Sequence, residues 1–270
     1  GIMSSVMRTF LSDKDEIITA KNSFIGFRVL ANASGIKTHW VPMKNYHYDL
    51  IAMSKFINDK TKLIYLANPD NPMGTYFNKK EFDKFMNNVP NNILVILDEA
   101  YFEYVSEQKD YPDSMIYRYD NVITLRTFSK IYGLAGLRIG YGFAHKNLID
   151  NLMKVKLPFE PSTTAQIAAI AALDDLKHIK ESLKINKKNM DKICNSLESI
   201  GIFYIESYAN FVTIRFDNST NANLFCKFML SKGIILRNLK GFGLDSYVRI
   251  TIGNDEETNC LIDTLYEFYS

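Results

Sequence analysis

The chain has 270 residues, of which 47% are hydrophobic and 23% are charged, so it can bury a substantial core in one large or two ordinary domains. Its formal net charge of +2 gives no electrostatic reason to expect a nucleic-acid partner. The sequence has no apolar run near the ~20 residues of a membrane span, and it does not open with a signal peptide. We therefore expect a soluble, cytoplasmic protein that binds neither nucleic acid nor membrane.

The cysteines and histidines do not form a metal-binding signature. Cys194, Cys226 and Cys260 share no short paired spacing and fall in helix-like stretches. They predict buried thiols in a reducing compartment, with a redox or metal role as the alternative. The four histidines are scattered, so we predict no metal site.

The first ten residues already have the pattern of an amphipathic helix. A chain rarely begins inside such an element. We therefore expect further sequence to precede Gly1 in the natural protein.

The first half of the chain alternates apolar runs with amphipathic stretches. The apolar runs predict strands over residues 16–20, 38–42, 62–67, 92–97, 122–125 and 137–144. Helices are expected between them, over residues 24–34, 49–59 and 79–88. Strands without polar alternation, separated by helices, indicate a mainly parallel sheet covered on both faces, which is the α/β class.

The pattern changes from about residue 146 onward. Helices are predicted over residues 146–156 and 163–199, with prolines between them. Half-buried strands over 211–216 and 247–252, the apolar segment 233–237, a helix over 221–231 and a terminal helix then predict a smaller α+β unit. We expect two domains, residues 1–155 and 156–270.

A segment rich in hydrogen-bond donors surrounds Lys130. Thr127 and Ser129 come just before this lysine, and Arg138 follows eight residues after it. A lysine that forms a Schiff base needs a fixed, partly desolvated position. The phosphate of a pyridoxal cofactor needs hydroxyl and guanidinium donors close by. The segment therefore predicts a site for a phosphate-bearing aldehyde cofactor.

Glycines are frequent directly after this lysine, at positions 133, 136, 140 and 142. They allow the backbone to turn back so that the arginine can return to the lysine. A dinucleotide-binding fingerprint is the alternative interpretation. We reject it because these glycines precede a predicted strand and do not open a helix.

Other polar residues follow two predicted strands at their carboxyl ends, where open α/β sheets bind ligands. Asp98 ends a buried run, where a carboxylate is costly unless it is paired. A pyridinium nitrogen would pair with it and stay protonated, whereas a helix N-cap or a surface turn is the alternative. Tyr101 could donate to the cofactor's phenolic oxygen or pack in the core. Asn71 could have the same role or be a plain turn residue between prolines.

Two further side chains are candidates for contacts in the site. Phe24 could stack on a cofactor ring, although an aromatic near a strand end usually contributes packing. Arg249 lies within an apolar strand, and a half-buried arginine needs an anion. A substrate carboxylate or phosphate would supply that anion, and so would an internal Asp or Glu.

Taken together, the order and spacing of these motifs resemble the fold-type I pyridoxal-phosphate aminotransferases, and within them the histidinol-phosphate aminotransferase family. The resembling segments are Asn68-Pro69-Asp70-Asn71-Pro72-Met73-Gly74, Leu97-Asp98-Glu99-Ala100-Tyr101, Arg126-Thr127-Phe128-Ser129-Lys130, Gly133-Leu134-Ala135-Gly136-Leu137-Arg138, Gly233-Ile234-Ile235-Leu236-Arg237 and Val248-Arg249-Ile250-Thr251-Ile252-Gly253. The likeness covers essentially the whole chain. It is more specific for the superfamily than for the substrate.

The resemblance implies a large domain with a mainly parallel, seven-stranded-type sheet that binds pyridoxal 5'-phosphate, and a homodimer in the cytoplasm. It implies that Lys130 is the Schiff-base lysine and proton shuttle, and that Asp98 holds the pyridine nitrogen. The remaining implied roles are the ring hydroxyl for Asn71 and Tyr101, the phosphate for Thr127, Ser129 and Arg138, ring stacking for Phe24, and the substrate's anionic end for Arg249.

The sequence departs from the family pattern in three places. Asn22 stands where a proline usually precedes the stacking aromatic by two residues. Met73 replaces a threonine in the Asn-Pro turn. Gly1 aligns just after the family's glycine-rich phosphate loop, whose backbone donors at a helix N-terminus would complete the cofactor site. We therefore expect weak or absent cofactor binding by a chain that truly begins there, and a strong visible absorbance band from these 270 residues would contradict this.

The implied reaction is ping-pong transamination between histidinol phosphate and 2-oxoglutarate in histidine biosynthesis, with a small-molecule amino donor and a 2-oxo acid as partners. A threonine-phosphate decarboxylase or an aromatic amino-acid aminotransferase of the same fold is an alternative. A non-catalytic scaffold that keeps the fold is an alternative of another class.

Overall fold

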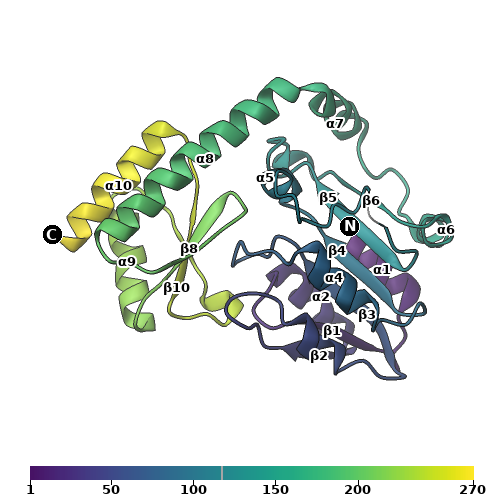
Figure 1. Ribbon diagram of the computed structural model, residues 1–270. Helices are drawn as coiled ribbons and strands as arrows, with labels where there is room; N and C mark the ends of the chain where they lie inside the picture. The colour runs from purple at the N-terminus through teal and green to yellow at the C-terminus, as the bar shows by residue number, and fades with distance from the viewer. Residues whose placement is uncertain (117) are drawn as a thin grey trace.

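The computed structural model describes residues 1–116 and 118–270, which include two sheets (Figure 1). The two sheets have separate apolar cores. The first sheet has the strand order β2-β1-β3-β4-β5-β6. Its strands are β1 (Glu16–Ala20), β2 (Lys37–Val41), β3 (Thr61–Ala67), β4 (Leu94–Asp98), β5 (Val122–Thr127) and β6 (Gly140–Phe143). We call this sheet with its helices the N-terminal unit.

The first five strands are parallel, and β6 is antiparallel to β5. Every residue of β1 and of β4 is buried, because helices cover the sheet. Parallel strands that are buried on both faces have no polar alternation, which is the pattern of the sequence. The predicted α/β class is confirmed, and the sheet has six strands within the described part of the chain.

Most helices of the N-terminal unit pack apolar side chains against this sheet. The helices of this unit are α1 (Ile2–Phe10), α2 (Ile25–Ser34), α3 (Leu50–Ser54), α4 (Lys79–Met86), α5 (Phe102–Val105) and α6 (Lys146–Val155). Local sequence signals fix several of their ends. Asn78 and Glu81 form a capping box at the start of α4, and Gly35 ends α2 in the left-handed conformation.

The second sheet is antiparallel, with the order β7-β8-β10-β9. Its strands are β7 (Tyr204–Ile205), β8 (Phe211–Arg215), β9 (Arg237–Asn238) and β10 (Tyr247–Thr251), and its helices are α8 (Leu176–Ser199), α9 (Ser219–Ser231) and α10 (Asp255–Tyr269). We call this sheet with these helices the C-terminal unit. Figure 1 shows α8 running from this unit to α7 (Thr163–Asp174), beside the N-terminal unit. Among the described residues, no helix is both long enough and apolar enough to cross a membrane.

Three predicted elements differ from the structure. The helix expected over 163–199 is two helices, because Asp175 ends α7 and its side chain accepts from the backbone N–H of His178 to start α8. The helix expected over 49–59 stops at Ser54. The strand expected over 137–144 is limited to β6, because residues 135–137 form a 3₁₀ turn.

The prediction of buried cysteines was wrong for Cys260. This thiol is exposed, whereas Cys194 and Cys226 are half-buried. Cys260 lies on α10, whose buried side chains are Thr258, Leu261, Thr264 and Leu265. The thiol therefore falls on the solvent face of that helix.

Hydrogen bonds connect the two units. Thr213 Oγ1 donates to the carbonyl of Pro72 over 2.5 Å, and the backbone N–H of Tyr208 donates to the carbonyl of Gly74 over 2.8 Å. After β1, Asn22 Nδ2 donates to the carbonyl of Phe242 over 2.7 Å. These bonds bring β8 and β10 to the carboxyl ends of the parallel strands.

Gly74 makes this contact possible. Its φ of +80° belongs to the left-handed region, and an added Cβ would lie 2.1 Å from Ser207 Oγ and 3.0 Å from Ser207 Cα. Gly35 also has a positive φ, of +71°, but a Cβ there would meet nothing within 4 Å. Substitutions at Gly35 and Gly74 therefore distinguish the cost of backbone strain, which both share, from the cost of crowding between the units, which only Gly74 has.

We expect Gly35→Ala to lower the free energy of unfolding by about 1 kcal/mol, the cost of a left-handed non-glycine residue. Gly74→Ala should lower it by roughly 2–3 kcal/mol, because the units must also move apart. Urea unfolding of both variants measures the difference. Equal losses would show that Ser207 yields without cost.

Candidate active site

Polar side chains gather at the carboxyl ends of three neighbouring parallel strands. Asp98 is the last residue of β4, and its Cα partners in the sheet are Ala67 at the end of β3 and Leu125 in β5. Asn71 follows β3 by four residues, and Thr127 is the last residue of β5. The parallel register thus brings candidates from distant parts of the sequence to one edge.

Asp98 is a carboxyl group at the buried end of a strand, with only 7% of the residue exposed. The Tyr65 hydroxyl donates to Oδ2 over 2.8 Å, and the backbone N–H of Ala100 donates to Oδ1 over 3.2 Å. Burial raises its pKa to about 6, while these two hydrogen bonds and the charge of Lys130 act in the opposite direction. A cation seated against Asp98 would stabilise its ionised form.

Lys130 is half-buried, and its Nζ lies 5.1 Å from the centroid of the Tyr101 ring. Burial lowers its pKa below the ordinary lysine value, and the positive charges of Arg249 and Arg138 lower it further. The charge of Asp98 acts in the other direction. A lysine amine in these surroundings is deprotonated more easily and is a better nucleophile.

Asn71 connects the strand-end residues with the C-terminal unit. Its Oδ1 accepts from Nη1 of Arg249 over 2.6 Å, and its Nδ2 lies 3.4 Å from the hydroxyl oxygen of Tyr101. Burial raises the pKa of Tyr101 to about 12, so this hydroxyl keeps its proton at neutral pH. The Asn71 amide and the Tyr101 hydroxyl are therefore two neighbouring hydrogen-bond donors.

Arg249 has spare hydrogen-bonding capacity. Its guanidinium lies over the Phe211 ring at 4.7 Å, and burial lowers its pKa. Its Nε is buried without a hydrogen-bond partner, and no carboxylate forms a salt bridge with it within residues 1–116 and 118–270. The internal Asp or Glu that the sequence left open is therefore not found in this part of the chain. An anionic ligand would complete the bonding of this arginine.

The predicted phosphate ligands lie at the end of β5 and in the turns that follow it. The backbone N–H of Ser129 donates to Thr127 Oγ1 over 3.1 Å, and Arg138 Nη1 lies 3.5 Å from Ser129 Oγ. Arg138 is exposed and has a φ of +52°, where the chain reverses before β6. The reversal returns the guanidinium to the Ser129 hydroxyl beside Lys130, as the glycine spacing predicted.

Phe24 and Arg237 complete the surroundings. Phe24 is half-buried at the start of α2 and packs against the core of the N-terminal unit. Arg237 of β9 pairs in register with Arg249, and its charge contributes to the lowered pKa of Arg249. Two like charges on neighbouring strands mark a position for an anion.

Sequence reasoning missed Arg237 and Tyr65. Arg237 is exposed, so the argument from a half-buried arginine does not apply to it, and only its register with Arg249 singles it out. Tyr65 offered no signal either, because a tyrosine inside a buried run usually contributes packing. Its contact with Asp98 depends on strand register, which the sequence does not state.

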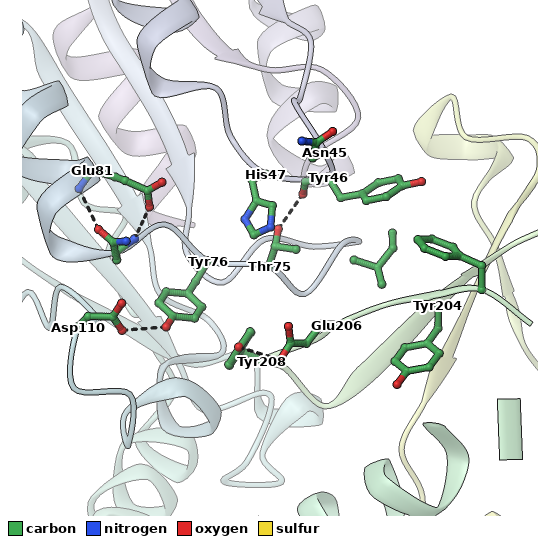
Figure 2. Close-up of a pocket in the computed structure, with 13 residues that line it drawn as sticks. Asn45, Tyr46, His47, Thr75, Tyr76, Glu81, Asp110, Tyr204, Glu206 and Tyr208 are labelled. Atoms are coloured by element: carbon green, nitrogen blue, oxygen red, sulfur yellow. Dashed lines mark hydrogen bonds between the residues drawn. The ribbon is translucent and has the colours of Figure 1, made fainter. Parts of the chain in front are cut away.

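A separate cavity of about 490 Å³ lies between the units, and none of the predicted site residues lines it (Figure 2). Tyrosines and carboxylates form much of its wall. Tyr76 donates to Asp110 over 2.8 Å and Tyr208 donates to Glu206 over 2.9 Å, as the dashed lines show. Its carboxylates are paired within the wall, so we place the chemistry at the strand ends.

The fold and the site define a class of enzyme that the comparisons identify. The sequence pattern of the family "Aminotransferase class I and II" matches residues 1–265, so the chain belongs to this family. A histidinol-phosphate aminotransferase 1 of Nitrosococcus oceani is 41% identical over 266 residues, which are 98% of this chain and 71% of that protein. A histidinol-phosphate aminotransferase of Caldicellulosiruptor saccharolyticus is 40% identical over 268 residues, or 98% of this chain and 74% of the relative.

A solved structure agrees with these relatives. The histidinol-phosphate aminotransferase of Sinorhizobium meliloti in complex with pyridoxal-5'-phosphate superposes with a TM-score of 0.92 at 28% identity. The match covers 100% of this chain and 74% of that one. The resemblance to the histidinol-phosphate aminotransferase family is confirmed.

Because burial raises the pKa of Asp98 in the folded chain, its contribution to stability is present below pH ~4 and is lost as the pH rises through about 6. Asp98→Asn cannot ionise, so without cofactor it should exceed the wild type in stability at pH 8 by roughly 2–3 kcal/mol. The difference should vanish near pH 4. Urea unfolding from pH 4 to 8 measures it, with the exposed Asp59→Asn as the control, and a difference that does not depend on pH would contradict the assignment.

Proposed function

We propose that this chain is a pyridoxal-phosphate-dependent histidinol-phosphate aminotransferase, with 2-oxoglutarate as the amino acceptor. The observation that carries this proposal is the arrangement of Lys130 near a buried Asp98 and near Arg249, whose buried Nε has no hydrogen-bond partner. The relatives bear the name of this activity over nearly the whole chain. The Sinorhizobium meliloti relative was solved with the cofactor.

The residues at the strand ends fit the chemistry of this cofactor. Asp98 is a buried carboxyl whose ionised form needs a cation, which a protonated ring nitrogen supplies. Asn71 and Tyr101 present donors for a ring oxygen. Thr127, Ser129 and Arg138 would hold the phosphate, and Phe24 would pack on the ring. When bound, pyridoxal phosphate supplies an electron sink for the electrons of the broken C–H bond.

Three side chains of this chain then have roles in proton transfer and charge stabilisation. Lys130 Nζ, with its lowered pKa, accepts a proton from the substrate carbon and returns it at another position. With the cofactor bound, Asp98 would hold its charge against the ring nitrogen. Tyr101 keeps its hydroxyl proton at neutral pH and serves as a hydrogen-bond donor.

Arg249 and Arg237 fit a substrate with an anionic end. A guanidinium binds phosphate and carboxylate oxygens through similar geometry. One pair of arginines thereby serves the phosphate of histidinol phosphate in the first half-reaction and a carboxylate of 2-oxoglutarate in the second. This supports a ping-pong reaction at a single site.

We further propose that residues 1–155 form the cofactor-binding domain and residues 156–270 the smaller domain, in a cytoplasmic protein. Separate apolar cores in the two units support a division into two domains, and the buried Ala165 and Ala169 of α7 pack with Phe128 and Ile139 of the first domain. The three cysteines are free thiols, which a reducing compartment preserves.

A spectral titration of the cofactor-loaded protein tests the function. Histidinol phosphate should convert the visible absorbance of the bound cofactor to that of its amine form, and 2-oxoglutarate should restore it. Lys130→Ala should slow the conversion by roughly 10²–10⁴-fold, because it removes the acid–base group. The exposed Lys146→Ala should leave the conversion unchanged.

Other outcomes of the titration would replace the proposal. Release of carbon dioxide from a phosphorylated substrate would make the chain a decarboxylase. Conversion by aromatic amino acids alone would make it an aromatic aminotransferase. A protein that binds cofactor but reacts with none of these substrates would be a non-catalytic scaffold.

We also propose that the protein is a homodimer. The supporting feature is α7, where Ile167, Ile170 and Leu173 form an apolar stripe with 64%, 65% and 46% of each residue exposed. Monomeric proteins rarely expose such a continuous face. Sedimentation velocity should show a dimer that Ile167→Glu with Ile170→Glu dissociates, and a wild-type monomer at micromolar concentrations would contradict the proposal.

A further inference from the structure

Tyr65 is a buried tyrosine of β3 that the proposed function does not use. It is 0% exposed, and its ring stacks on Phe27 of α2 with centroids 4.0 Å apart and planes 6° from parallel. The ring is therefore fixed between the sheet and the helix that begins after Phe24. Packing alone would need only a phenylalanine at this position.

Strand register directs the hydroxyl of Tyr65 toward Asp98. Tyr65 pairs with Ile96 on β4, and Ala67 pairs with Asp98. Residues 65 and 67 point to the same face of the sheet, because side chains alternate along a strand. The long phenol thus spans the two-residue offset and places its oxygen 2.8 Å from Asp98 Oδ2.

The hydrogen bond has a fixed direction. Burial and the charge of Asp98 raise the pKa of Tyr65 well above its ordinary value, so the phenol keeps its proton. The hydroxyl therefore donates and the carboxylate accepts. Oδ1 accepts the backbone N–H of Ala100, so each carboxylate oxygen is held on one side and keeps a lone pair for a further donor.

We propose that Tyr65 is a positioning residue that keeps Asp98 ionised and oriented toward the ring nitrogen of the cofactor. The inference rests on the proposed function for the identity of the cofactor, but the contact with Asp98 exists in the chain itself. A donated hydrogen bond favours the ionised carboxyl group against the burial that opposes it. Through Asp98, Tyr65 sets the pH range in which the ring nitrogen keeps its proton.

Carboxyl ¹³C NMR of the cofactor-free protein tests the contact directly. The resonance of Asp98 is assigned by its absence in Asp98→Asn. Tyr65→Phe keeps the stacked ring and removes the hydroxyl, so the titration midpoint of Asp98 should rise by about one pH unit or more. An unchanged midpoint would overturn the proposal.

Tyr111→Phe is the matched control. Tyr111 is also buried, but its hydroxyl donates to the backbone carbonyl of Asn68 over 2.6 Å, a group that does not titrate. This variant should leave the Asp98 midpoint unchanged. If both variants moved it equally, the effect would come from general loosening and the proposal would fail.

A second variant acts in the opposite direction and keeps the hydroxyl. Fluorotyrosine at position 65 has a more acidic phenol and donates more strongly, so the Asp98 midpoint should fall. This outcome remains measurable if Tyr65→Phe does not fold. A midpoint that rises or stays constant would contradict the proposal.

Pyridoxal phosphate labelled with ¹⁵N in its ring extends the test to the cofactor. In Tyr65→Phe the ring nitrogen should lose its proton about one pH unit lower than in the wild type, and Tyr111→Phe should match the wild type. A constant ¹⁵N shift would overturn the role toward the cofactor. If Asp98 responds but no cofactor binds even at a saturating concentration, the proposed function fails while the contact between Tyr65 and Asp98 stands.

Discussion

The buried carboxyl group of Asp98 is the constraint on which the rest of the site depends. A parallel strand covered on both faces delivers this group to a place where water cannot solvate it, and burial raises its pKa to about 6. The surrounding groups offset part of this cost of ionising Asp98. Tyr65 and Ala100 donate hydrogen bonds, and the charge of Lys130 is near enough to favour ionisation. A cation placed against Asp98 would offset the rest of the cost.

The same low-dielectric surroundings act on the cations with opposite sign. Burial lowers the pKa of Lys130 and of Arg249, and each is lowered further by a neighbouring positive charge. One site thus holds a carboxyl group whose ionised form needs a cationic partner and an amine that gives up its proton readily. A transaminase needs both properties, because its lysine must act as nucleophile and base while its ring nitrogen keeps a proton.

The C-terminal unit completes this arrangement by bonds between turns. Thr213 and Tyr208 bind the carbonyl groups of Pro72 and Gly74, directly after Asn71. Arg249 of β10 can therefore reach the Asn71 side chain over 2.6 Å. The departures of this chain from the family pattern leave these bonds intact. Met73 replaces a hydroxyl residue without removing Asn71, and Asn22 supplies an amide that binds Phe242, which a proline could not do.

The sequence by itself determined the α/β class, the family and the candidates around Lys130, because apolar periodicity, turn residues and donor spacing are local features. The prediction of one continuous helix over 163–199 was wrong. The side chain of Asp175 caps the start of a second helix, and this depends on the local backbone geometry at Asp175. The tertiary structure alone decided that Tyr65 reaches Asp98 and that Arg249 meets Asn71. The physical reason is that strand register and the packing of the two units bring together residues 33 and 178 positions apart, and spacing along the chain carries no information about such contacts.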